Sequence, residues 1–416
     1  MELWAWGLGG LKAWGLLSVS GEAKLHDEGR RFFIFFPMRI SCYKRGMTPL
    51  ERVHVGIIGC GRISGLHALG YQDHPRAEIV AVCDHDSDTA QRAQAEWGAK
   101  KVYRDYTKLL ADADINAVEI LLPHHLHREV AIAALQAGKH VSLQKPPVLT
   151  LRDLDDVHEA AMAAGRRLRV FENFMYYPPH VKARELVHDG AVGEPLSVRM
   201  QTLGGRLQDG WPIPAATHLW RMDPQTCGGG PTCFDHGYHC FNMGRFFITE
   251  PVERVHAWIH VNRFGTNALY DGPLFVSWKY AGIPKFGSWE VIASIGMRMR
   301  AQYYPADDRM EIHGSEGIIW VNRCTAHLLD EPPLVLYRNG ETRAWHDIPS
   351  DWADSFRGGT HEFIDALIEG RQPAQDADDA AATLRFSIAA HVSACEQREV
   401  RLDEIGPDTR AQLPAE

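Results

Sequence analysis

Short apolar runs alternate with amphipathic segments between residues 51 and 172. The runs are four to six residues long and rich in Val and Ile, which favours strands, whereas the intervening segments hold helix formers and end at glycines. Strands that alternate with helices in this way predict a doubly wound parallel sheet, so we expect an α/β domain of Rossmann type over 51–172. The expected strands are 53–58, 79–83, 117–122, 140–143 and 168–171, and the expected helices are 65–69, 89–97, 105–110, 127–136 and 153–164.

The pattern changes after Pro178 and Pro179. Long alternating runs then follow one another without helices between them, which predicts a large open sheet that is mostly antiparallel or mixed. We therefore expect a second, α+β domain over 173–405 and a tail over 406–416. Its expected strands are 195–202, 252–261, 274–280, 288–300 and 309–321, and its expected helices are 180–187, 361–369 and 380–394.

Residues 1–50 differ from the rest of the chain. They carry several tryptophans and the aromatic run 32–36 without a helical or strand period. No small-residue cleavage site follows that run, and no segment of the chain reaches the roughly 18–20 apolar residues that a membrane span needs. We expect an extension that is disordered or not native, with Met47 as the natural start.

Composition and charge narrow the class of protein. A chain of 416 residues is long for one core, which favours two domains. The net charge of -9 gives no basic surface for nucleic acid and no polybasic surface for a membrane. The eight cysteines form no CxxC pair, which indicates a reducing compartment and a cytoplasmic protein.

A glycine-rich turn follows the first expected strand. Gly59 permits the tight turn, Gly61 lets the backbone approach a pyrophosphate, and the amides after Arg62 and Ile63 face that anion. Asp84 ends the next apolar run, where a carboxylate accepts both ribose hydroxyls. His85 and Asp86 follow it, and a ribose phosphate would meet carboxylates there, which favours NAD over NADP.

Two other strand ends supply polar candidates. Pro123 and His124 follow one strand, and His124 is the better placed of two histidines to touch the nicotinamide side. His127 opens a helix, where it serves either the cofactor or helix packing. Gln144 and Lys145 end the next strand, and Lys145 could hydrogen-bond a substrate hydroxyl and stabilise a developing alkoxide.

The densest group of polar residues lies in the second domain. On one helix, Asp235 and His239 would share a face and form a proton relay. Two alternatives stay open: a metal site made with His236, and a helix start capped by Asp235. Upstream, a flat apolar ring and polar side chains suit a sugar, and we assign substrate binding to His218, Trp220, Arg221 and Asp223.

These motifs together resemble the Gfo/Idh/MocA oxidoreductase family, named for glucose–fructose oxidoreductase, inositol dehydrogenase and a rhizopine catabolism protein. The resemblance covers about residues 53–402. It rests on Gly59-Cys60-Gly61-Arg62-Ile63, Ala137-Gly138-Lys139-His140-Val141 before Gln144-Lys145-Pro146, Gly228-Gly229-Gly230, and Asp235 with Gly237 and His239.

The resemblance implies roles for particular residues. Lys145 matches the lysine of the family's Glu-Lys-Pro motif, His239 matches the usual acid/base, and Glu172-Asn173 matches a strand end that faces the nicotinamide. Gln144 departs from the family's glutamate and removes a charge beside Lys145. The resemblance also implies a homodimer or homotetramer formed through the second domain's sheet.

The leading hypothesis is an NAD-dependent dehydrogenase that acts on a hydroxyl of a sugar, cyclitol or glycoside. His239 would take the hydroxyl proton, Lys145 would polarise the oxygen, and Asp235 would position the histidine or bind substrate. Two other hypotheses are a transient oxidation that cleaves a glycosidic bond without net NADH release, and a non-catalytic nucleotide-bound regulator. The acid/base residues disfavour the regulator, because a sensor needs none. No metal is expected.

Overall fold

The computed structural model describes residues 48–211, 215–264 and 268–415. Most of the expected extension, with the Met47 start, lies outside these residues. No helix in the described ranges has both the length and the apolar content to span a bilayer.

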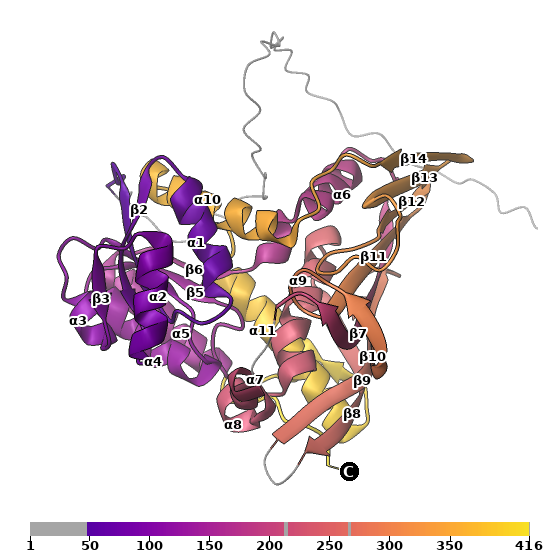
Figure 1. Cartoon of the computed structure of the whole chain (residues 1–416). Helices are drawn as coiled ribbons and strands as arrows, with labels where there is room; N and C mark the ends of the chain where they lie inside the picture. Colours follow the sequence, from indigo (N-terminus) through magenta and orange to yellow (C-terminus); the bar gives the residue numbers. More distant parts are fainter. Residues whose placement is uncertain (1–47, 212–214, 265–267, 416) are drawn as a thin grey trace, which may run out of the picture. The chain divides into compact units, whose positions relative to one another are not determined.

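The first domain is a parallel sheet of six strands in the order β3-β2-β1-β4-β5-β6 (Figure 1). The reversal of order at β1 is that of a doubly wound sheet, which confirms the expected fold class. The strands are β1 (Val53–Ile58), β2 (Ala77–Cys83), β3 (Lys101–Tyr103), β4 (Ala117–Ile120), β5 (His140–Gln144) and β6 (Leu168–Phe171). The helices are α1 (Ser64–Asp73), α2 (Ser87–Trp97), α3 (Tyr106–Leu110), α4 (His124–Gln136) and α5 (Leu151–Ala164).

The second sheet has nine strands in the order β14-β13-β12-β11-β7-β10-β9-β8-β15, with the β13–β14 hairpin at one edge (Figure 1). Only β7 and β10 pair in parallel, so the sheet is mixed, as expected. Its strands are β7 (Pro195–Asp209), β8 (Val252–Phe264), β9 (Ala268–Tyr280), β10 (Phe286–Arg300), β11 (Ala306–Gly314), β12 (Gly317–Val321), β13 (Leu334–Arg338), β14 (Glu341–Trp345) and β15 (Val400–Arg401).

The helices of the second half connect and cover the two sheets. They are η1 (Asn173–Tyr176), α6 (Pro178–His188), α7 (Ala215–Met222), α8 (Pro224–Cys227), the π-helical turn η2 (Pro231–His236), α9 (Gly237–Phe247), α10 (Trp352–Glu369), α11 (Ala377–Glu396) and η3 (Leu402–Glu404). One face of the sheet is therefore buried under helices such as α9 and α11.

Helix α10 packs with the first domain although it follows the second sheet in the chain. Phe363, Ile364 and Leu367 belong to the same buried cluster as Val53 and Tyr71. The segment 406–415 is also held, because the Arg152 amide donates to the Pro407 carbonyl at 2.9 Å and the Arg152 guanidinium pairs with Asp408.

Candidate active site

The glycine-rich turn between β1 and α1 fits a dinucleotide. Gly59 has a φ of 92°, and a Cβ there would lie 2.4 Å from the Leu121 carbonyl oxygen, so only glycine fits. A Cβ at Gly61 would meet nothing within 4 Å, which leaves its backbone open to a pyrophosphate. One carboxylate oxygen of Asp84 accepts from the Cys60 amide at 2.9 Å. The acid thus lies against the turn, where ribose hydroxyls would meet it.

Arg62 and Ile63 occupy the approach to α1. Ile63 is the residue before the first helical turn and has no side-chain cap. The Arg62 guanidinium lies 5.4 Å from the centroid of the Trp211 ring, in cation–π contact, and its Nε is buried without a hydrogen-bond partner in the described residues. A buried donor beside the turn fits a site for an anionic group.

Lys145 meets Asp235 where the two domains join. The Lys145 Nζ donates to Asp235 Oδ1 at 2.7 Å and to the Asp235 carbonyl oxygen at 2.9 Å. The Arg221 Nε donates to Asp235 Oδ2 at 2.7 Å. Burial would raise the pKa of Asp235, but Lys145 and Arg221 hold that pKa well below its ordinary value. Asp235 is therefore ionised and holds Lys145 in place.

His239 pairs with Glu172, and the expected relay between Asp235 and His239 is wrong. The His239 Nδ1 lies 2.7 Å and 2.8 Å from the two carboxylate oxygens of Glu172, and the ring stacks on Phe174 with centroids 4.1 Å apart. Asp235 lies in the π-helical turn η2 and His239 in α9, so their four-residue spacing does not give one helical face.

The electrostatics around His239 favour a neutral ring. Burial lowers the pKa of His239, and the Glu172 carboxylate only partly offsets this effect. The Nδ1–H then donates to Glu172, and Nε2 makes no hydrogen bond to any described residue. The ring thus presents a proton acceptor.

His236 points to a third carboxylate, Asp308. Its Nε2 lies 2.8 Å from Asp308 Oδ1, and Asp308 is buried. The two histidines of the metal site considered from the sequence therefore pair with different carboxylates, His236 with Asp308 and His239 with Glu172. Ligand atoms of His236, Cys240 and Asp308 lie within 4.8 Å of one another. Around zinc, ligands about 2.0 Å from the ion would lie roughly 3.3 Å apart, so a 2.8 Å separation marks a hydrogen bond.

His124 and His127, which the sequence assigns to the cofactor, are both buried and held by contacts within the protein. The His124 Nδ1 donates to the Cys227 carbonyl oxygen at 2.7 Å, and burial lowers its pKa to about 3. The His127 ring is fully buried, with Nδ1 3.0 Å from the carbonyl oxygens of both Pro146 and Pro147 and Nε2 2.8 Å from that of Leu122. Pro123 immediately precedes α4, as its N-cap residue.

Gln144 connects Lys145 to a buried polar network. Its Oε1 accepts from the Lys145 amide at 2.8 Å, and its Nε2 donates to His67 Nε2 at 2.9 Å. The His67 Nδ1 lies 2.9 Å from the buried carboxylate of Glu119. The uncharged amide of Gln144 therefore joins the Lys145 backbone to the buried His67 ring.

The Asn173 side chain also forms its hydrogen bond with another residue of the protein. It is 3% exposed, and its Nδ2 donates to Ser355 Oγ at 2.8 Å. Its neighbour Glu172 caps η1 by accepting from the Phe174 amide at 2.9 Å. The strand end of β6 thus contributes the carboxylate of Glu172 to the site, while the Asn173 amide donates to α10.

The expected substrate residues divide into three cases. The His218 side chain lies outside the described residues. Trp220 lies edge-on to His124, with centroids 4.8 Å apart, and the Arg221 guanidinium lies over the Trp220 ring at 4.3 Å. Asp223 caps α8 by accepting from the Gln225 amide at 2.9 Å. Trp220 and Arg221 therefore belong to the site, whereas Asp223 shapes the next turn.

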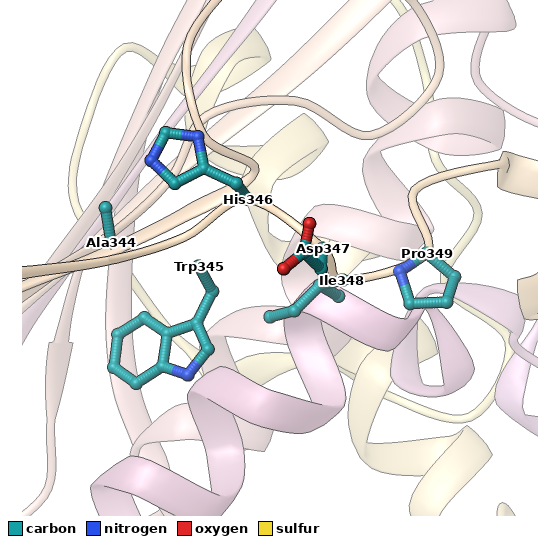
Figure 2. Close-up of a pocket in the computed structure, with 6 residues that line it drawn as sticks. All are labelled: Ala344, Trp345, His346, Asp347, Ile348 and Pro349. Atoms are coloured by element: carbon teal, nitrogen blue, oxygen red, sulfur yellow. The ribbon is translucent and has the colours of Figure 1, made fainter.

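A hollow of about 420 Å³ lies elsewhere, along residues 344–349, which include the end of β14 and the segment after it (Figure 2). None of its lining residues belongs to the cluster around Lys145 and His239. The hydrogen bonds and burial of that cluster, and not the size of this hollow, identify the candidate site.

Comparison with known proteins agrees with this geometry. Residues 53–172 match the model of an oxidoreductase family with an NAD-binding Rossmann fold, and residues 180–320 match the GFO/IDH/MocA C-terminal domain. Myo-inositol 2-dehydrogenase of Thermotoga maritima is 27% identical over 363 residues, which cover 85% of this chain and 99% of that protein. D-apiose dehydrogenase of Paraburkholderia graminis is 27% identical over 88% of this chain and 93% of its own.

A solved structure extends the likeness to the whole fold. GenD2 from gentamicin A biosynthesis, in complex with NAD, has a TM-score of 0.68 and 26% identity over 86% of this chain and 98% of its own. The two domain models of one family match the two domains of the fold, the Rossmann model the first domain and the C-terminal model the second. The chain belongs to the Gfo/Idh/MocA family and is an NAD-binding oxidoreductase.

Proposed function

We propose that Lys145 and His239 carry out the NAD-dependent oxidation of a hydroxyl-bearing carbon on a sugar or cyclitol. The observation that carries the proposal is the separate pairing of the two groups. Asp235 holds the Lys145 ammonium, and Glu172 holds a buried His239 ring whose pKa is lowered by that burial. A fixed cation beside a neutral base is the arrangement that removes a proton from a hydroxyl.

Each residue has one task in this mechanism. The His239 Nε2 accepts the hydroxyl proton, and the Glu172 carboxylate stabilises the imidazolium that forms. The Lys145 ammonium donates a hydrogen bond to the same substrate oxygen as its negative charge develops. Asp235 holds the ammonium in position by a hydrogen bond, and Arg221 holds Asp235 through its other carboxylate oxygen. NAD, bound at the turn around Gly59, supplies the hydride acceptor.

The test is NADH absorbance on mixing the purified protein and NAD with myo-inositol, D-apiose, levoglucosan, D-glucose and aryl glycosides. We expect absorbance to rise with at least one compound. His239→Ala and Lys145→Ala should abolish the rise while NAD still binds, and the exposed His188→Gln should keep it. Turnover retained in both alanine variants would refute the assignment. A flat trace together with a cleaved glycoside, detected by mass, would favour the redox-assisted cleavage.

We also propose that the chain assembles through the open face of the second sheet. Trp258 and Phe275 form a cross-strand pair on that face and are 60% and 38% exposed. Phe286 and Ile292 of β10 project from the same face, because they flank Glu290, the partner of Phe275. An exposed apolar patch of this kind marks an interface. Sedimentation should show a dimer or tetramer, and Trp258→Glu should shift it towards monomer.

The remaining proposal concerns the compartment. All seven described cysteines are free thiols, and six of them are buried. Free thiols persist in reducing compartments, which supports a cytoplasmic enzyme. Fractionation of cells that produce the protein would test this, and recovery in an oxidising compartment would refute it.

A further inference from the structure

His236 is a second histidine of the candidate site with no task in the proposed mechanism. It lies three residues before His239, and the two ring centroids are 5.7 Å apart. Its side chain is 24% exposed, whereas that of His239 is 7% exposed. Both rings border Phe174, and His236 lies edge-on to it with centroids 6.2 Å apart. The two imidazoles are therefore neighbours that both contact the Phe174 ring.

The inner edge of the His236 ring is fixed by a chain of hydrogen bonds. The Nε2 donates to Asp308 Oδ1 at 2.8 Å, and that oxygen also accepts from Thr202 Oγ1 at 2.6 Å. The Trp289 Nε1 donates to Thr202 Oγ1 at 2.9 Å. Asp308, Thr202 and Trp289 lie on three neighbouring strands, β11, β7 and β10. The sheet thus sets the orientation of the ring.

The outer edge of the ring is free to meet a ligand. The His236 Nδ1 makes no hydrogen bond to any residue that the structure describes, and it is not among the enclosed atoms. Such a nitrogen, on a ring held by a rigid partner and without a bond to the described residues, is arranged to bind an oxygen of a ligand. The charge of Asp308 outweighs burial and raises the pKa of His236, so Nδ1 carries a proton over a wider pH range than in a free histidine.

We propose that His236 binds a second substrate oxygen, on the carbon next to the one whose hydroxyl His239 deprotonates. The spacing of the two rings suits the two oxygens of a vicinal diol, one on each imidazole. His236 would therefore make the enzyme select sugars or cyclitols that carry a hydroxyl beside the oxidised carbon. This inference rests on the proposed function. His236 acts here through its contact with substrate, and Asp308 is a positioning residue.

The experiment compares a polyol with its monodeoxy analogue in wild type and in a matched pair of variants. The compound is whichever of myo-inositol, D-glucose or levoglucosan gives NADH. His236→Gln places its amide near the position of Nε2, so it keeps a donor for Asp308 and removes Nδ1. His236→Asn places its amide near the position of Nδ1 and loses the bond to Asp308. His188→Gln, on an exposed histidine, is the control.

We expect wild type and His188→Gln to prefer the polyol over the analogue that lacks the neighbouring hydroxyl by about 10- to 150-fold in kcat/KM. His236→Gln should lose that preference and still bind NAD, while His236→Asn should keep part of it. An unchanged preference in His236→Gln, with turnover intact, would overturn the inference and leave the proposed function standing. Failure of wild type to oxidise any of the compounds would overturn the proposed function and the inference with it.

Discussion

Replacing Glu172 by glutamine isolates the charge that supports His239. The Glu172 side chain is fully buried, and its two oxygens lie 2.7 Å and 2.8 Å from His239 Nδ1. Oε1 also accepts from the Phe174 amide at 2.9 Å. Glutamine keeps one carbonyl oxygen for these donors and removes the negative charge. The variant should therefore fold normally and lose only the stabilisation of the imidazolium.

The magnitude follows from the kind of bond that is lost. A hydrogen bond to a charged group contributes about 1.5–3 kcal/mol, which corresponds to about a 10- to 150-fold change in rate. We expect Glu172→Gln to lower kcat/KM by that factor at neutral pH without changing the Kd for NAD. Glu250→Gln, which removes a carboxylate paired with Lys285 outside the site, should change neither constant.

The pH dependence gives an independent reading of the same contact. Oxidation needs a neutral His239, so kcat/KM falls as pH drops through the pKa of that ring. Because burial lowers this pKa, the acid limb of the wild-type profile should lie below pH 6.5. Glu172 raises the pKa, so its removal should move the limb to lower pH. A limb that moves to higher pH, or an unchanged kcat/KM, would refute the role of Glu172.

Three further predictions concern folding and cofactor binding. Gly59→Ala should lower the melting temperature because of its φ of 92°, whereas Gly61→Ala should melt normally and bind NAD more weakly; equal effects in both assays would contradict this. Asp235→Ala leaves Lys145 without its carboxylate and should cost about 3–5 kcal/mol in urea unfolding, so a loss below about 1 kcal/mol would count against the pair. Burial lowers the pKa of His140 to about 3, so below pH 6.5 this group binds a proton in the unfolded chain and not in the folded one. His140 should therefore contribute about 1.4 kcal/mol per pH unit to the loss of stability from pH 6.5 towards pH 4, and His140→Gln should lower the measured slope by that amount.

The sequence pattern predicted the two sheets well because burial imposes a period on apolar residues. It failed where that period was absent or misleading. Strand β14 (Glu341–Trp345) is mostly exposed and polar, so nothing in its residues indicated a strand. The run 309–321 alternates through a turn, and the structure divides it between β11 and β12.

The sequence predicted which residues form the candidate site better than it predicted which of them pair with one another. Lys145, Asp235 and His239 all lie in the cluster. The partner of His239 is Glu172, 67 residues earlier in the chain, and such a pairing depends on how β6 meets α9. The full burial of His127 likewise depends on the carbonyl oxygens of a distant turn. Motif spacing carries no signal for either contact.

The return of α10 to the first domain has a consequence for synthesis on the ribosome. Phe363, Ile364 and Leu367 complete the buried cluster that contains Val53 and Tyr71. Domains usually fold from the N-terminus as the chain emerges. Here the nucleotide-binding half cannot complete its buried cluster until about residue 369 has left the exit tunnel. Part of its apolar surface therefore stays uncovered while the second sheet is synthesised. A nascent chain that stops before α10 therefore exposes the kind of surface that chaperones bind.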